Sequence, residues 1–147
     1  MRKSLVILVM AIVAVFLTTS AFAKTKCPQP RKTKAAPGGM VKKKIPGSAD
    51  AAKGKALYHK KAKPMACKMC HGDKGDGAGK LGKALKPAPR NFTCAATMKK
   101  ISAGQMFHVI KNGSTGTGMV GHKKTLKDAD IWNVVKYIRT ELCKGCS

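Results

Sequence analysis

A five-residue string, Cys67-Lys68-Met69-Cys70-His71, constrains this chain more than any other feature of its sequence. Two thiols at this spacing can add across the two vinyl groups of a haem, and the imidazole that follows at once can bind the haem iron. The string therefore predicts one covalently bound haem c, attached through Cys67 and Cys70, with His71 as an iron ligand. A bound macrocycle would also supply apolar bulk to a small chain in which only 5% of residues are aromatic.

Two other kinds of site use paired cysteines. A zinc site would need two further ligands, and Cys143 with Cys146 could nominally complete a four-thiolate set. The 72 residues between the two pairs exceed the usual spacing of such sites. A thioredoxin-like dithiol would sit in a βαβ pattern, which this sequence lacks. The sequence therefore favours haem over zinc or dithiol chemistry.

Residues 1–23 have the pattern of a cleavable signal peptide. Arg2 and Lys3 precede an apolar run from Leu5 to Leu17, and Ala21-Phe22-Ala23 places small residues where a signal peptidase reads them. The apolar run is too short to cross the hydrocarbon core of a bilayer as a helix. We therefore expect export to a compartment where haem is attached to thiols, namely a bacterial periplasm.

Four further cysteines fit an oxidising compartment. They could form two disulfides, and the sequence leaves three pairings open for Cys27, Cys94, Cys143 and Cys146. We prefer a bond between Cys94 and one of the C-terminal pair. The C-terminal pair has the spacing of a redox motif, but no histidine follows it, so we do not expect a second haem there.

The charge of the chain points to its partners. Without Arg2 and Lys3 of the leader, 28 of the 30 Lys and Arg residues remain against 6 acidic residues, a net charge of +22. A field of this sign favours acidic redox proteins and allows peripheral contact with an anionic membrane. Nucleic acid is not an expected partner, because export removes the chain from it and no aromatic-interleaved basic motif occurs. We expect a monomer.

The mature chain divides into two parts by composition. Residues 24–46 hold eight Lys or Arg, no acidic residue and several prolines and glycines, which predicts a disordered basic arm. Residues 47–147 predict one all-α domain with three or four helices and no alternating strand.

The helices are predicted from their caps and apolar periodicity. Ser48 can cap a helix that reaches Lys63, and Ser102 can open a second that ends at Asn112-Gly113. A last helix begins within residues 125–128 and carries an apolar stripe: Ile131, Val134, Val135, Ile138 and Leu142.

The glycine- and proline-rich residues 72–93 predict a long loop that wraps a ligand.

Met119 is the best candidate for the sixth iron ligand. It lies 48 residues beyond His71 in a glycine-rich loop, where Gly118 and Gly121 let the backbone come close to a porphyrin. His122 is the leading substitute. Ligation by His and Met raises the reduction potential relative to ligation by two His, so this choice decides which redox partners are reachable.

The region from about residue 49 to residue 139 resembles a class I monohaem cytochrome c. The order and spacing of its motifs carry the resemblance: Gly54 and Tyr58, Cys67, Cys70 and His71, the glycine-rich residues 72–79, Pro87 and Pro89 before Asn91-Phe92-Thr93, Met119, and the run from Asp130 to Arg139. The resemblance implies the small cytochrome c fold, in which the helices wrap around one covalently bound haem.

The resemblance also implies roles for single residues. Gly54 and Tyr58 would lie where the first helix crosses the last. The carbonyl of Pro87 or Pro89 would accept a hydrogen bond from His71 and fix its orientation. Lys127 departs from the family pattern, because many members have a capping Ser or Thr there.

These expectations converge on a periplasmic one-electron carrier rather than an enzyme. With protein ligands on both sides, iron would have no open position for oxygen, peroxide or substrate. Two alternatives stay open. If Met119 does not bind, five-coordinate iron would suit a haem enzyme or a gas sensor. The chain could also be the haem subunit of a larger respiratory complex.

Overall fold

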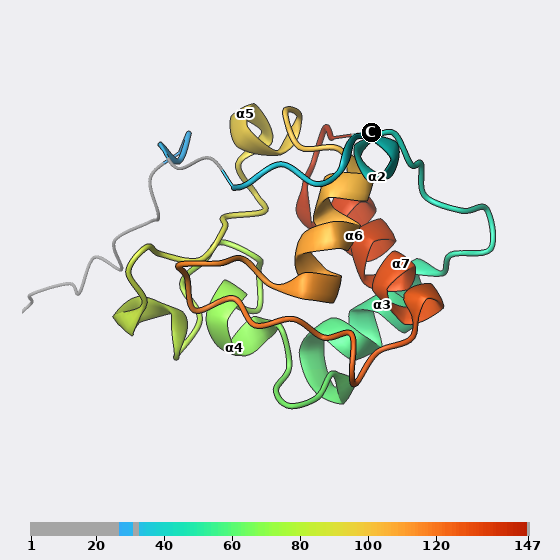
Figure 1. Ribbon diagram of the computed structural model, residues 1–147. Helices are drawn as coiled ribbons and strands as arrows, with labels where there is room; N and C mark the ends of the chain where they lie inside the picture. Colours follow the sequence, from blue (N-terminus) through green and yellow to red (C-terminus); the bar gives the residue numbers. More distant parts are fainter. Residues whose placement is uncertain (1–26, 31–32, 147) are drawn as a thin grey trace, which may run out of the picture.

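The computed structural model describes residues 27–30 and 33–146, and this part of the chain is helical with no strand (Figure 1). The α-helices are α2 (Gly38–Val41), α3 (Ala51–Ala56), α4 (Lys68–His71), α5 (Ala95–Met98), α6 (Ala103–Asn112) and α7 (Asp128–Tyr137). The π-helical turns η2 (Leu57–Lys61) and η4 (Ile138–Leu142) continue α3 and α7, and η3 (Gly82–Ala84) is a 3-10 turn. The all-α prediction is confirmed.

No helix within residues 27–30 and 33–146 is long and apolar enough to cross a membrane. The predicted signal peptide, residues 1–23, lies outside the described residues.

The N-cap of the first long helix lies two residues later than predicted. The Asp50 carboxylate accepts hydrogen bonds from the backbone N–H groups of Ala52 at 2.8 Å and Lys53 at 3.1 Å. These bonds lower the pKa of Asp50 and make it the cap in place of Ser48, which corrects the expected start. The backbone N–H of Asp50 donates to Oδ1 of Asn133 at 2.7 Å, so the start of α3 is tied to α7.

The crossing of α3 with α7 is the most extensive packing between helices in the described chain (Figure 1). A Cβ atom at Gly54 would overlap the backbone carbonyl of Asn133, so only glycine allows this close approach. One turn on, the ring of Tyr58 lies 5.4 Å from that of Tyr137. Both roles implied by the family resemblance are confirmed.

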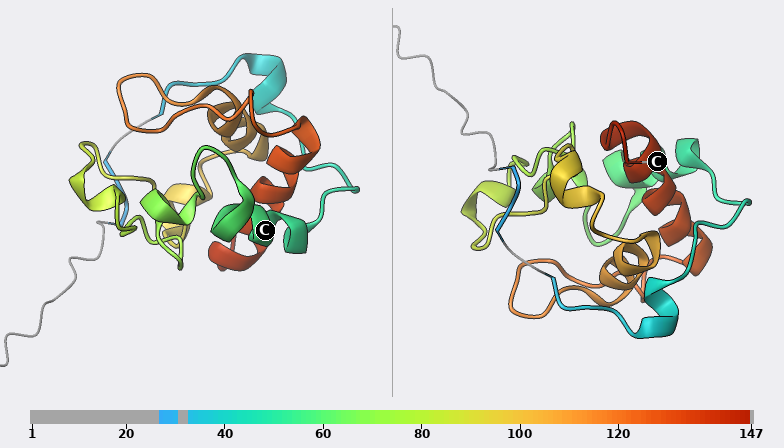
Figure 2. Two further views of the ribbon diagram at one scale, coloured as in Figure 1. Left: turned by 90° about the horizontal axis from the view of Figure 1, so that it is seen from below. Right: turned by 90° about the horizontal axis from the view of Figure 1, so that it is seen from above.

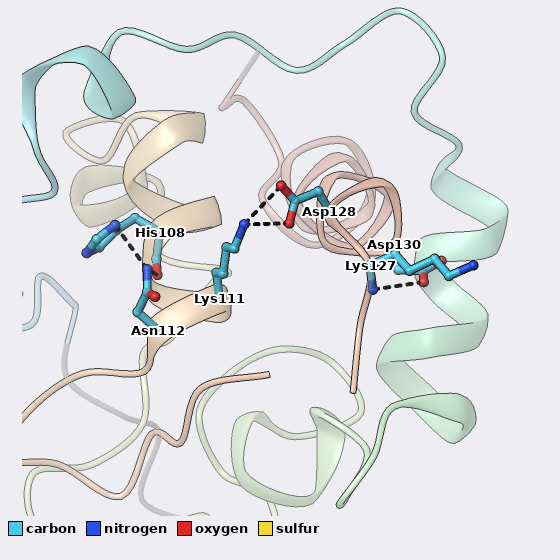
Figure 3. Close-up of polar contacts among 6 residues, drawn as sticks. All are labelled: His108, Lys111, Asn112, Lys127, Asp128 and Asp130. Carbon is cyan, nitrogen blue, oxygen red and sulfur yellow. Dashed lines mark hydrogen bonds and ion pairs between the residues drawn. The ribbon is translucent and has the colours of Figure 1, made fainter. Parts of the chain in front are cut away.

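Helix α7 also packs against α6. Ser102 caps α6 as expected, since its hydroxyl accepts from the backbone N–H of Gln105 at 3.1 Å. Lys111 on α6 donates to the Asp128 carboxylate at 2.7 Å, which joins the end of α6 to the start of α7 (Figure 3).

The missing cap at Lys127 is compensated by Asp130, whose carboxylate accepts from the Lys127 N–H at 3.3 Å (Figure 3).

The disulfides differ from the preferred pairing. Cys27 is bonded to Cys94, and Cys143 is bonded to Cys146. The preference for joining Cys94 to the C-terminal pair was wrong, because Cys143 and Cys146 close a turn just after η4. Cys94 instead meets the N-terminal segment, which passes beside α5.

The described part of the predicted basic arm is not a free tail. The buried Ala36 donates its N–H to Oε1 of Gln105 at 2.7 Å, and Nε2 of Gln105 donates to the carbonyl of Lys34 at 3.0 Å. Beyond this point α2 packs against α6, where Met40 lies on Gly104. Figure 2 shows the segment in blue and cyan, running along the outside of the helices. A disulfide, hydrogen bonds to the Gln105 side chain and the apolar residues Ala36, Met40 and Ile45 hold it on the domain.

Replacement of Gly54 by Ala should lower the free energy of unfolding by about 1–3 kcal/mol, because the new methyl group would force α3 away from α7. Guanidinium unfolding followed by circular dichroism measures this effect. Gly39→Ala is the matched control, since a Cβ atom there would meet nothing within 4 Å. Equal unfolding midpoints for the two variants would contradict the role of the crossing.

Candidate functional site

The predicted attachment motif forms a single turn of helix. Cys67 lies just before α4, and the backbone N–H of His71 donates to the Cys67 carbonyl at 2.9 Å. Residues three and four apart share a face of a helix, so Cys67, Cys70 and His71 are brought to one side. All three line the same cavity, which has a volume of about 310 Å³.

Two close backbone approaches hold α4 in place. A Cβ atom at Gly82 would overlap the carbonyl of Cys70, and one at Gly79 would lie 2.5 Å from the carbonyl of Met69. Gly72 ends the helix with a φ of +83°, a conformation that favours glycine. The glycine-rich loop therefore packs directly on the turn that carries the motif.

His71 is fixed in the form that a metal requires. Its Nδ1 lies 3.0 Å from the carbonyl oxygen of Arg90, and its ring stacks on Phe92 with centroids 4.5 Å apart. Burial lowers the pKa of His71, which favours the neutral imidazole. Because Nδ1 must donate to a carbonyl, Nε2 of the neutral ring keeps its lone pair and can bind iron.

The acceptor of this hydrogen bond corrects a prediction. The family resemblance implied the carbonyl of Pro87 or Pro89, but the carbonyl of Arg90 takes this role. The Pro89 carbonyl is engaged elsewhere, because it accepts from Nε2 of Gln29 at 2.9 Å. Gln29 belongs to the N-terminal segment, and no pattern near the motif signals this contact.

The two thiols of the motif are not bonded in a disulfide. Burial raises the pKa of Cys67 to about 11 and also raises that of Cys70. A redox dithiol needs a thiolate at neutral pH, so these shifts speak against that alternative. Cys143 and Cys146 are bonded to each other and cannot complete a zinc site. Among the residues that the structure describes, no three His, Cys, Asp or Glu side chains gather as a metal cluster.

Met119 lines the same cavity as His71 and comes from the loop between α6 and α7. Its backbone N–H donates to Oγ1 of Thr117 at 3.0 Å, and its carbonyl accepts from the N–H of Ser114 at 2.9 Å. The loop thus folds on itself and presents the half-buried thioether to the cavity. Gly113, at a φ of +80°, makes the turn that begins it.

His122, the alternative ligand, also lines the cavity and is buried. Its Nδ1 lies 2.9 Å from the carbonyl of Lys63, so one ring nitrogen is engaged in the protein. This bond ties the loop after Met119 to the chain just before the motif. It gives His122 a structural task that Met119 does not have.

The cavity suits a large, mainly apolar cofactor. Leu, Ile, Val, Met, Pro and Phe side chains dominate its wall, and its volume falls in the range of about 300–1,000 Å³ usual for ligand pockets. Among the described residues of the wall, Arg90 is the only one of the types Lys, Arg, Asp and Glu. Its guanidinium donates to Gln29 at 3.3 Å and to Thr33 at 3.1 Å, which places a polar corner where carboxylates of a haem could be received.

The mouth of the cavity is apolar, and exposed lysines lie close to its lining residues in the sequence. The three large hydrophobic side chains that the described chain exposes, Met65, Leu81 and Val120, all line the cavity. Several exposed lysines are their neighbours in the sequence: Lys63, Lys80, Lys83, Lys86 and Lys123. An exposed cofactor edge here would be framed by positive charge.

Comparison with known proteins agrees with this geometry. Residues 51–141, more than half of the chain, match the family model described as Cytochrome c. A search of curated proteins finds no match. Among solved structures, the fold is similar to a chain of the Kuenenia stuttgartiensis reducing HAO-like protein complex Kustc0457/Kustc0458, with a TM-score of 0.51 and 20% identity. The match covers 80% of this chain and 48% of that chain, so this chain spans about half the length of its neighbour.

Joint replacement of Cys67 and Cys70 by Ala should leave no covalently bound pigment, because both thioether positions are lost. Extraction into acidified organic solvent, followed by absorption spectroscopy of the protein pellet, measures this. The matched control is joint replacement of Cys143 and Cys146 by Ser, which should keep the pigment on the protein. A red pellet from the Cys67/Cys70 variant would place the attachment elsewhere.

Proposed function

The chain belongs to the cytochrome c family, and on that premise we propose that it is a periplasmic one-electron carrier with one haem, attached at Cys67 and Cys70 and ligated by His71 and Met119. A cytochrome c domain implies a covalently bound c-type haem, whose iron takes up and releases one electron. One observation carries the proposal: all four side chains line a single apolar cavity.

The protein's own residues set the conditions for this transfer. Arg90 holds His71 in one tautomer, so the ligand does not have to rotate when the charge of the metal changes. Hydrogen bonds within the loop fix the backbone of Met119 and so limit the movement of its thioether. If His71 and Met119 both hold the iron, no position on it would be left for a substrate. His/Met ligation raises the reduction potential relative to bis-His ligation.

The mouth of the cavity is the proposed electron exchange surface. Leu81 and Val120 are 43% and 50% exposed, and they offer an apolar centre for close contact with a partner. The surrounding lysines would steer an acidic redox protein to this point. We therefore propose acidic proteins as partners of a monomer, with no role for nucleic acid.

Export to the periplasm is supported by the pattern of residues 1–23 and by the disulfides. The bonds Cys27–Cys94 and Cys143–Cys146 fit an oxidising compartment. Lys42, Lys43 and Lys44 are exposed after α2, and they could add peripheral contact with an anionic membrane.

The oxidised wild-type protein should show the near-infrared charge-transfer band of a sulfur–iron bond. Met119→Ala should abolish the band, because it removes the thioether that lines the cavity. Met65→Ala, which removes another methionine of the cavity wall from an exposed position, is the matched control and should keep it. Absence of the band from wild type, or its persistence in Met119→Ala, would refute the proposed ligand set.

Carbon monoxide separates the carrier from its alternatives. The reduced wild-type protein should bind it poorly at neutral pH, and reduced Met119→Ala should bind it readily, as followed by the visible spectrum. Ready binding by wild type would favour the five-coordinate haem enzyme or gas sensor. The third possibility, a haem subunit of a larger respiratory complex, would be revealed by co-purification of the native protein with a membrane complex.

Replacement of Lys80 and Lys86 by Glu should slow electron transfer from ferrocyanide about tenfold or more at low salt, because it reverses charge beside the cavity mouth. It should also speed transfer to a cationic cobalt complex. Stopped-flow absorbance of the haem measures both rates. The control variant, Lys53→Glu with Lys55→Glu on α3, makes the same charge change away from the cavity wall. Equal effects of the two variants would show that only net charge matters.

A further inference from the structure

One side chain from the N-terminal segment reaches the support of the iron ligand. Gln29 lies outside the region matched by the family model, which begins at residue 51. Its Nε2 donates to the Pro89 carbonyl at 2.9 Å, and its Oε1 accepts from the backbone N–H of Asn91 at 2.9 Å. One amide therefore holds the chain on both sides of Arg90.

The position of the second bond has a specific consequence. The N–H of Asn91 and the carbonyl of Arg90 belong to the same peptide group. That carbonyl accepts the hydrogen bond from Nδ1 of His71 at 3.0 Å. A hydrogen-bond chain thus runs from the imidazole through one peptide group to the Gln29 amide. The peptide group is conjugated, so a hydrogen bond accepted from its N–H makes its carbonyl a stronger acceptor.

We propose that Gln29 is a positioning residue for the iron ligand: it orients and polarises the Arg90–Asn91 peptide group, which strengthens the hydrogen bond from His71 and lowers the reduction potential of the bound haem. The inference rests on the proposed function, with His71 as ligand. A stronger acceptor at Nδ1 leaves more electron density on Nε2, and a more basic ligand stabilises the more highly charged ferric iron.

The backbone around Gln29 is anchored well enough for this role. Its own N–H donates to Oγ1 of Thr97 at 3.2 Å, and Cys27, two residues earlier, is bonded to Cys94. The side-chain oxygen has a further donor in Nη1 of Arg90 at 3.3 Å, which fixes the orientation of the amide. The nitrogen must face Pro89 and the oxygen must face Asn91.

Gln105 provides a matched control. Its amide also makes two hydrogen bonds to the N-terminal segment, with the N–H of Ala36 and the carbonyl of Lys34. It is not bonded to residues 89–91 by any contact that the structure gives. Gln105→Met should therefore loosen the segment and leave the hydrogen-bond chain to His71 intact.

The experiment compares Gln29→Met with Gln105→Met in the haem-loaded protein. In a solution poised at the wild-type midpoint, Gln29→Met should show a ferrous-to-ferric ratio about two- to fivefold higher, the effect of one weakened hydrogen bond. Gln105 lines the same cavity as Gln29, so Gln105→Met controls for the loss of a polar side chain from the wall, and its shift should be clearly smaller. In proton NMR of the reduced protein, the His71 Nδ1–H signal of Gln29→Met should move upfield and exchange faster with solvent.

Three outcomes would overturn the inference. They are a wild-type ratio in Gln29→Met, an equal shift in both variants, and an unchanged Nδ1–H signal in Gln29→Met. The sulfur–iron band must persist in Gln29→Met, since its loss would show that the change acts on the loop of Met119 instead. Failure of the proposed function is distinguishable, because it would remove this band from the wild-type protein itself.

Discussion

The hydrogen bond from His71 to the carbonyl of Arg90 sets the requirement that the loop after α4 has to meet. The motif itself places an imidazole at the end of a short helix, but a carbonyl nineteen residues away decides which ring nitrogen is free. The intervening loop must therefore return to its starting point. It does so through Gly75, whose carbonyl accepts from the N–H of Phe92 at 2.6 Å, and Phe92 then stacks on the ligand. The glycines of this loop are a geometric condition for the proposed haem site.

The crossing of α3 with α7 is joined to the same site through Tyr58. Tyr58 of η2 is fully buried against α7, and its hydroxyl donates to the carbonyl of Gly72 at 2.8 Å, just after the proposed iron ligand. Desolvation raises the pKa of Tyr58 far above its ordinary value, so the hydroxyl stays a donor. The crossing that Gly54 permits is thus connected to the position of His71 through one side chain. Stability of the helix pair and geometry of the ligand are linked for this reason.

Local patterns in the sequence predicted a large part of this arrangement. The spacing of Cys67, Cys70 and His71 is a property of one helical turn, and the cap at Ser102 depends on its near neighbours. Such features need no knowledge of the rest of the chain. The contact of Gly54 with α7 was available only through the family resemblance, because it joins residues far apart in the sequence. Met119 is placed on the cavity wall as the spacing indicated, while its bond to iron stays a prediction.

The sequence did not predict the disulfide pairing or the acceptor for His71, because both depend on the path of the N-terminal segment. Its composition is that of a disordered chain, and nothing in it signals that Gln29 and Ala36 find partners on the domain. The bond of Cys27 to Cys94 follows from that path, and the acceptor for His71 shifts to Arg90 while Gln29 occupies Pro89. Hydrogen bonds between single side chains and distant parts of the chain determine these features. Such bonds leave no periodic pattern in the sequence.

The pairing of Cys27 with Cys94 has a consequence for the maturation of the protein. In a chain that enters an oxidising compartment from its N-terminus, Cys67 and Cys70 emerge before Cys94 does. Oxidation in order of emergence would consume the two thiols that the pigment needs. Six thiols must therefore be sorted into four that are oxidised and two that stay reduced. If the chain is exported as proposed, Cys27 can pair with Cys94 without consuming these thiols once the polypeptide has folded back on itself, or once the pigment has been attached.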